Sequence, residues 1–146
     1  MNKNIMMSLF KRRGNQTTQT RVFDDFDIDT KAEILAHLAL NTDDVPVVAS
    51  ILDAGHWCLI TSKQTIAYVS GETASIENSS IRQVATNLCA DYSSGARQMK
   101  DLSYIEVTSV STSLLLQIEA GEAFWGVYNV LSGIAERNLK ALEALH

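Results

Sequence analysis

The sequence contains little proline and cysteine, and it has no long apolar run. The single proline in 146 residues, Pro46, excludes a proline-rich linker. Cys58 and Cys89 lack the spacing of metal ligands, and we expect both to be reduced thiols in a cytoplasmic protein. No apolar run approaches the about 20 residues of a membrane-spanning helix. Apolar residues make up 46% and charged residues 20% of the chain, which predicts one domain with a packed core.

Recognisable catalytic motifs are also missing. The sequence has no nucleophile elbow, no phosphate-binding loop and no dinucleotide-binding glycine motif. His37, His56 and His146 have no second ligand at metal-binding spacing, so we interpret them as surface or packing residues. The carboxylates of Glu119 and Glu122 are better explained by the electrostatics of a helix start. We therefore predict a non-enzymatic protein without a metal or cofactor.

Charge is unevenly distributed along the chain. Residues 1–21 carry five basic residues and no acid, whereas the remainder carries seven basic and seventeen acidic residues. The two parts have formal charges of +5 and −10, which together give the net charge of −5. Because an acidic body repels the phosphate backbone, we expect no binding of nucleic acid by the folded domain.

The N-terminal segment, residues 1–21, is predicted to be a flexible basic tail. Residues 1–13 combine a small apolar cluster with trailing cations, a composition typical of a weak interfacial anchor on anionic membranes. The residues that would contact the membrane are Ile5, Met6, Leu9, Phe10, Lys11, Arg12 and Arg13. The second interpretation is a frayed terminus that makes no membrane contact.

A short helix is predicted over residues 30–40, before the sheet. Asp25, Asp27 and Asp29 alternate as in an EF-hand loop, but the glycine and the glutamate that such a loop needs are missing. Thr30-Lys-Ala-Glu33 instead fits a capping box, in which two side chains bond the first backbone amides of a helix. We therefore expect a helix start here and not a calcium site.

Polar breaks at residues 53–56, 62–64, 70–72 and 77–80 recur every eight or nine residues, which predicts successive antiparallel strands. The expected strands are 45–53, 57–61, 65–69, 73–77, 80–86, 102–110 and 113–118. Residues 79–92 also fit the spacing of a helix. A helix there would give a two-layer α+β fold instead of a continuous meander.

A candidate interaction loop follows this ambiguous segment. Residues 87–101 contain the small and polar residues of a long loop, with room for one helical turn. The loop holds one aromatic and two basic side chains, Tyr92, Arg97 and Lys100, which we expect to be accessible to a protein partner.

The last segment, residues 121–145, is predicted to be one long amphipathic helix, because apolar residues recur at steps of three and four. Gly126 and Gly133 each weaken such a helix by about 1 kcal/mol relative to alanine. We interpret them as positions where the helix approaches the sheet closely. The helix is longer than it needs to be to cover a small sheet, so we expect its last two turns to project and to pair with another subunit.

Three stretches of this pattern resemble the bacterial pleckstrin-homology-like domains. They are Trp57-Cys-Leu-Ile-Thr-Ser-Lys-Gln-Thr-Ile66, the segment Ile76–Val84, and Leu114-Leu-Leu-Gln-Ile-Glu-Ala-Gly121 followed by Phe124-Trp-Gly-Val-Tyr-Asn-Val-Leu131. The resemblance covers residues 45–140. It implies a mainly β, α+β fold: a bent, partly open antiparallel barrel, capped by the C-terminal helix, within one domain over residues 22–146. Phosphoinositide-binding relatives carry basic residues in the first strand-to-strand loop, but Asp53-Ala-Gly-His56 is acidic, so no lipid site carries over.

These features predict a non-enzymatic protein-interaction or scaffold domain that self-associates through a sheet edge or the projecting helix. A cytoplasmic location follows, with peripheral contact at the inner face of the membrane if the N-terminal segment is an anchor. The alternative function is a small acidic immunity- or inhibitor-type protein that masks a basic toxin or nuclease. The small size and the acidic body support this alternative.

Overall fold

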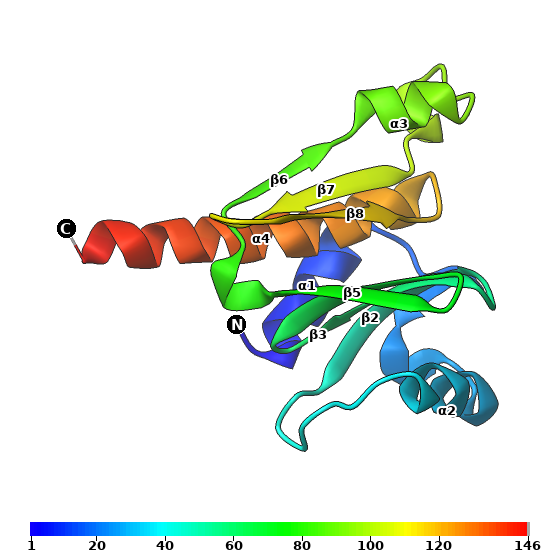
Figure 1. Ribbon diagram of the computed structural model, residues 1–146, viewed down its shortest axis with the longest axis horizontal. Helices are drawn as coiled ribbons and strands as arrows, with labels where there is room; N and C mark the ends of the chain where they lie inside the picture. Colours follow the sequence, from blue (N-terminus) through cyan, green and yellow to red (C-terminus); the bar gives the residue numbers. More distant parts are fainter. Residues whose placement is uncertain (146) are drawn as a thin grey trace.

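Two antiparallel sheets and four α-helices make up the part of the chain that the structure describes (Figure 1). The structure is a computed structural model, and it describes residues 1–145. In chain order the elements are α1 (Lys3–Arg13), β1 (Thr20–Val22), the 3-10 helix η1 (Phe23–Asp25), α2 (Ile28–Ala36), β2 (Pro46–Asp53), β3 (His56–Thr61), β4 (Gln64–Val69), β5 (Glu72–Glu77), η2 (Asn78–Ser80), β6 (Gln83–Thr86), α3 (Leu88–Ser93), η3 (Met99–Asp101), β7 (Tyr104–Thr108), β8 (Ser113–Gln117) and α4 (Glu122–Ala144).

The strands of the described residues form two separate meanders that do not close into one barrel. The first sheet has the order β1-β2-β3-β4-β5 and the second the order β6-β7-β8, with every neighbouring pair antiparallel. The predicted α+β fold class, with a bent antiparallel sheet and a long C-terminal helix, is confirmed. Residues 83–86 form strand β6, and the helical spacing over 79–92 corresponds only to the short helix α3 that follows it.

The first sheet is buried on both faces around β3. Trp57 and Leu59 pack in an outer apolar cluster beneath α2, whereas Cys58 and Ile60 pack in the main core between the sheets, α1 and α4. Successive side chains of a strand point to opposite faces, so a strand covered on both sides is apolar at every position. This explains the unbroken apolar run that begins at Trp57.

Helix α2 begins earlier than the sequence predicted. Asp27, and not Thr30, is the N-cap: its carboxylate accepts a hydrogen bond from the Thr30 backbone N–H at 2.7 Å. This bond lowers the pKa of Asp27. The predicted capping box and the helix bounds of 30–40 are therefore wrong, because aspartate caps a helix at least as well as threonine and the chain leaves the helix after Ala36.

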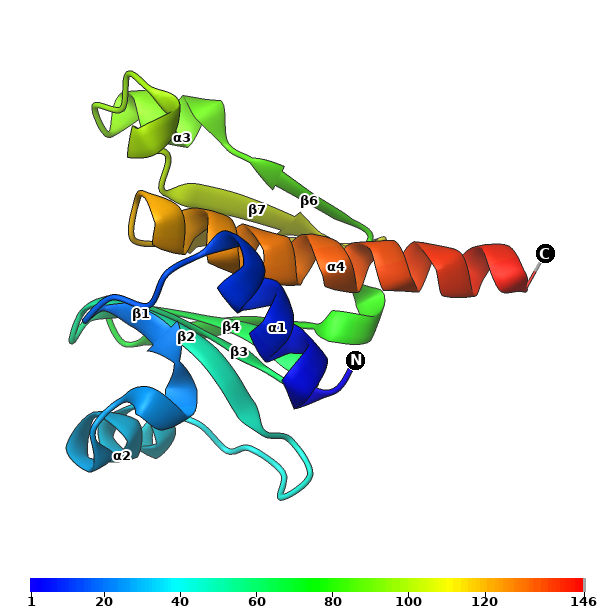
Figure 2. The same ribbon diagram turned by 180° about the vertical axis from the view of Figure 1, so that it is seen from behind.

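The predicted flexible tail is also wrong, because residues 3–13 form helix α1, which packs against α4 (Figure 2). Met6 and Phe10 are fully buried in the main core. The side-chain amide of Asn129 in α4 donates to the Leu9 carbonyl at 2.7 Å. The three cations Lys11–Arg13 occupy the last turn of α1, where they interact favourably with the helix dipole.

Close approach of the two helices depends on glycine. A Cβ atom added to Gly126 would lie 2.8 Å from the Phe10 ring and 3.0 Å from the Cα atom of Gly14. At Gly133, an added Cβ would lie 2.6 Å from a methyl group of Leu9. Gly126 and Gly133 therefore allow α1 to pack closely against α4. The sequence-based interpretation, that they allow close contact with the sheet, is wrong.

The segment that joins α1 to β1 is fixed by the start of α4. The Glu119 carboxylate accepts hydrogen bonds from the hydroxyl groups of Thr17 and Thr20, at 2.6 and 2.8 Å. The side-chain amide of Asn15 donates to the carboxylate of Glu122. The domain therefore begins with α1, and not at residue 22 as predicted.

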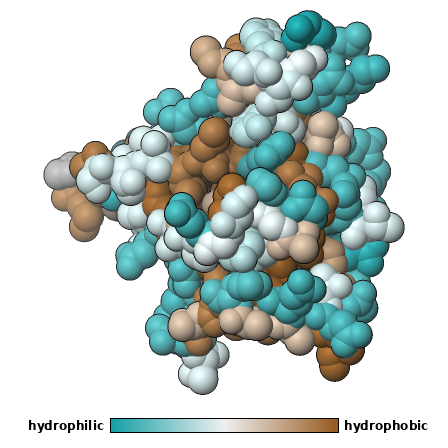
Figure 3. All heavy atoms as spheres, turned by 45° about the vertical axis from the view of Figure 1, so that its right-hand side comes forward, coloured by the Kyte–Doolittle hydropathy of each residue, from teal (hydrophilic) through white to brown (hydrophobic). Residues whose placement is uncertain are grey.

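Helix α4 is buried over its first half and projects over its second half. Its buried residues end at Ile134, while Leu139 and Leu145 are 52% and 79% exposed. The end of α4 extends beyond the rest of the molecule in Figure 1, and Figure 3 shows apolar atoms on it. The prediction of one long helix with projecting final turns is confirmed; His146 lies outside the described residues.

Candidate functional site

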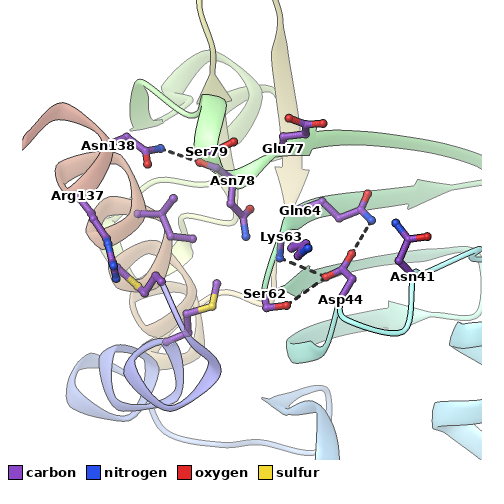
Figure 4. Close-up of a pocket in the computed structure, with 13 residues that line it drawn as sticks. Asn41, Asp44, Ser62, Lys63, Gln64, Glu77, Asn78, Ser79, Arg137 and Asn138 are labelled. Atoms are coloured by element: carbon purple, nitrogen blue, oxygen red, sulfur yellow. Dashed lines mark hydrogen bonds between the residues drawn. The ribbon is translucent and has the colours of Figure 1, made fainter. Parts of the chain in front are cut away.

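A cavity lies at the base of this projecting segment (Figure 4). It has a volume of about 430 Å³. Helix α4, the β3–β4 turn, η2, the loop before β2 and the start of α1 contribute its walls, with lining residues Met1, Met6, Asn41, Asp44, Ser62, Lys63, Gln64, Glu77, Asn78, Ser79, Ile134, Arg137 and Asn138.

The β3–β4 turn forms one wall and is held by Asp44. This carboxylate, only 6% exposed, accepts hydrogen bonds from the backbone N–H of Lys63 at 3.2 Å and from the Gln64 side chain at 2.8 Å. The Ser62 hydroxyl donates to it at 3.4 Å. Buried carboxylates need such donors, so Asp44 fixes the shape of the turn.

The opposite wall is a bridge between α4 and η2. The side-chain amide of Asn138 donates to the backbone carbonyls of Asn78 and Ile81, at 2.7 and 2.9 Å. Asn78 is itself buried: it accepts from the Thr65 hydroxyl at 2.8 Å and donates to the Thr61 carbonyl at 2.9 Å. This satisfied polar network makes the wall rigid.

Two charged side chains on opposite sides of the cavity remain available to a ligand or partner (Figure 4). Arg137 and Glu77 form no ion pair with the described residues, whereas Lys63 pairs with Asp43. No histidine or cysteine is among the residues that line the cavity. The arrangement suits binding of polar groups of either charge.

Beside the cavity, the projecting segment presents an apolar surface. We define the α4 tip as residues 139–145, which follow directly on Arg137 and Asn138. Leu139 and Leu145 are exposed and Leu142 is half-buried. Two turns of helix with three leucines outside the core, next to a polar cavity, form the candidate interaction site.

The predicted membrane-contact residues do not form one surface. Met6 and Phe10 are fully buried, and Leu9 is half-buried against α4. Ile5 is 43% exposed, and Lys11, Arg12 and Arg13 are exposed. An anchor that inserts Met6 and Phe10 into lipid is therefore incompatible with the fold, because the same side chains fill the core.

The predicted interaction loop lies apart from the cavity, on an extension between β6 and β7 that contains α3 (Figure 1). Tyr92, Arg97 and Lys100 are all exposed there. The Arg97 guanidinium donates to the carbonyl of Ala96 at 2.8 Å. The loop is accessible as expected, and whether it binds a partner stays a prediction.

The residues that shape the cavity escaped sequence analysis. Asn138 was the one detectable member, because it occupies a position on the apolar face of α4, four residues after Ile134 and four before Leu142. A polar side chain at such a position indicates a specific partner. Asp44 and Asn78 have no comparable pattern in the sequence.

The two cysteines differ sharply in their surroundings, which gives a direct test of the core. Cys58 is buried, and burial raises the pKa of its thiol to about 12, whereas Cys89 is exposed. Because the thiolate is the reactive form, we expect one thiol per native chain to react with Ellman's reagent at neutral pH, and two in denaturant. Rapid reaction of both thiols in the native protein would contradict the burial of Cys58.

Comparisons with known proteins give no family for this chain: no protein-family model, no curated protein and no solved structure matches it. In the described part of the chain, no helix combines the length and apolar character needed to cross a membrane.

Proposed function

We propose that the protein is a non-enzymatic interaction domain of the pleckstrin-homology-like kind that self-associates through the α4 tip. The four-stranded meander β2–β5, the three-stranded sheet β6–β8 and the terminal helix support the likeness of fold. The observation that carries the function is the exposure of Leu139 and Leu145 beyond the last buried turn of α4.

Exposed leucines at the tip favour an apolar partner. Removing apolar surface from water stabilises a complex by about 25 cal/mol per Å², and a projecting helix can lie along a second helix without disturbing its own core. A second copy of the same chain brings an identical stripe, as an isologous interface requires.

Charge at the α4 tip and in the helical turn before it is compatible with a second copy. Glu136 and Glu143 balance Arg137 and Lys140, and Glu136 already contacts Lys140 within the helix at 3.4 Å. Two such segments meet without net repulsion. Arg137 is exposed and forms no ion pair within residues 1–145, so its guanidinium is accessible to an acid of a second copy. Burial of a few leucines gives a weak interface, so we expect association that depends on protein concentration.

The test is the molar mass measured by light scattering over a wide range of protein concentration. We expect the wild type to rise towards twice the monomer mass of 16.1 kDa, and the double variant Leu139→Gln/Leu145→Gln to remain monomeric. Both leucines are exposed in the single chain and glutamine is a good helix former, so the variant should fold normally.

A matched control removes exposed apolar surface elsewhere. Val110, in the β7–β8 turn, is 85% exposed, and Val110→Gln should associate like the wild type. A wild type that is monomeric at every concentration, or a tip variant whose mass still rises, would refute self-association through the tip.

The alternative of an acidic inhibitor has less support in the folded protein. The basic residues of α1 belong to the same domain, so the folded unit carries the net charge of −5 and not the −10 of an isolated acidic body. Masking of a basic toxin or nuclease stays a prediction, and a tight, salt-sensitive complex with such a protein would support it.

A further inference from the structure

A second cavity, at the base of the α3 extension, is lined by Asp91, a carboxylate that has one oxygen without a hydrogen-bond partner within residues 1–145. Asp91 in α3 is fully buried. Its Oδ1 atom accepts hydrogen bonds from the backbone N–H of Ser103 at 2.7 Å and from the Ser103 hydroxyl at 3.1 Å. Its Oδ2 atom has no hydrogen-bond partner among the described residues.

The fold itself uses only one of these two oxygens. The bonds to Ser103 attach α3 to the start of β7, and an asparagine could make them equally well. A buried charged group without compensation is strongly unfavourable. The second oxygen therefore indicates a group from outside the described chain that carries donors or positive charge.

The surroundings of Asp91 are acidic and rich in acceptors. The cavity has a volume of about 260 Å³ and is lined by Asp91, Ser94, Gly95, Ala96, Asp101, Ser103 and Ala120, with no basic side chain among them. Asp101 is held in place there, because its Oδ2 atom accepts from the backbone N–H groups of Arg97 and Gln98, each at 3.2 Å. Two aspartates and two serines thus line one cavity.

Such a set of acceptors recognises an organic cation with N–H donors. Charge-assisted hydrogen bonds to a carboxylate are about twice as strong as neutral ones, and an ammonium or guanidinium group has several donors for the acceptors present. A metal ion is a poorer fit, because no three His, Cys, Asp or Glu residues within residues 1–145 form a metal-binding group.

We propose that this cavity binds an alkylammonium or guanidinium group, with Asp91 Oδ2 as its principal acceptor. The group can belong to a free amine or to a lysine or arginine side chain of another protein. The site is independent of the α4 tip, which lies on a different part of the molecule (Figure 1).

The experiment is a titration of the ¹⁵N-labelled protein followed by amide chemical shifts. The probes are n-butylammonium chloride, methylguanidinium chloride and N-acetyl-lysine methylamide, each compared with sodium chloride and magnesium chloride at equal ionic strength. We expect saturable shifts in residues 91–103 and 120 with at least one organic cation. Tighter binding of the lysine derivative than of butylammonium would identify a protein side chain as the better ligand.

Two variants and a control make the assignment specific. Asp91→Asn keeps the size and the Oδ1 acceptor, and should weaken binding about tenfold or more through loss of the charge. Ala120 is an exposed residue of the cavity lining. Ala120→Leu adds a larger side chain there and should also weaken binding, which keeps the test valid if Asp91→Asn fails to fold. Glu72→Gln removes a distant exposed carboxylate and should bind like the wild type.

The proposal is overturned if none of the organic cations gives saturable shifts in residues 91–103. It is also overturned if magnesium alone produces them, or if a folded Asp91→Asn variant and Ala120→Leu both bind like the wild type. None of these results bears on the mass measurement at the α4 tip.

Discussion

Replacing Phe10 with alanine is expected to lower the free energy of unfolding by about 3–5 kcal/mol, as large-to-small changes of buried aromatic residues do. Phe10 is fully buried and its ring lies over Gly126 of α4. The truncated side chain leaves a cavity between α1 and α4 that neither backbone can fill. Urea unfolding monitored by circular dichroism measures the change.

Ile5→Ala is the matched control, because Ile5 lies in the same helix and is 43% exposed. We expect a loss below about 1 kcal/mol, since little buried apolar area is removed and alanine favours the helix. Equally small losses for Phe10→Ala and Ile5→Ala would mean that α1 does not belong to the core, and would restore the interpretation of a mobile tail.

Replacing Gly126 with alanine is expected to destabilise the protein by about 2 kcal/mol, although alanine is the better helix former by about 1 kcal/mol. The new Cβ atom would lie 2.8 Å from the Phe10 ring and 3.0 Å from the Gly14 Cα atom. The backbone of Gly14 cannot rotate away as a side chain can, so the two helices must separate. Overpacking of this kind typically costs about 1–3 kcal/mol, and thermal and urea unfolding both report it.

The same substitution two turns further along the same face of α4 should have a different result. At Gly133 the new Cβ atom meets only the end of the half-buried Leu9 side chain, which can adopt another rotamer. We therefore expect Gly133→Ala to be within about 1 kcal/mol of the wild type, with the gain in helix propensity offsetting the rearrangement. A larger loss for Gly133→Ala than for Gly126→Ala would contradict the described packing of α1 on α4.

Much of the architecture could be predicted from local pattern alone. Short apolar runs predicted β2 to β5, and the polar breaks between them predicted the turns. The stripe of α4 was visible because a long helix repeats its pattern many times. The N-cap of helix α2 was predicted three residues too late. Asp27 and Thr30 are both residue types that cap helices, and the local sequence does not show which of them is the N-cap.

Helix α1 was misinterpreted because its burial depends on a distant segment. Basic residues and a short apolar cluster are typical of both an anchor and a packed helix. The separation of apolar and polar residues onto two faces is also weak in this helix of eleven residues. The spacing of Met6 and Phe10, four residues apart, together with Gly126 and Gly133 in the last helix, was the available indication of a helix pair. It was interpreted as contact with the sheet instead.

The two cavities could not be predicted for a related reason. Asp44, Asn78 and Asn138 lie far apart in the sequence and meet only through the sheet and α4. Asp91 looks like an ordinary polar residue of a loop, and only the folded chain shows that its carboxylate is fully buried. Apart from Asn138, whose position on the apolar face of α4 was a detectable signal, the burial of these polar groups is a property of tertiary structure that the single sequence does not reveal.

The contact between Gly14 and Gly126 joins positions separated by about 110 residues, and this has a consequence for synthesis on the ribosome. Helix α1 leaves the exit tunnel long before the surface on which it docks has been translated. An isolated helix of eleven residues is marginal in water, so α1 must wait as a fluctuating segment with Met6 and Phe10 uncovered. Such non-local closure is slow, and the nascent chain is most exposed to chaperones and to aggregation during that interval.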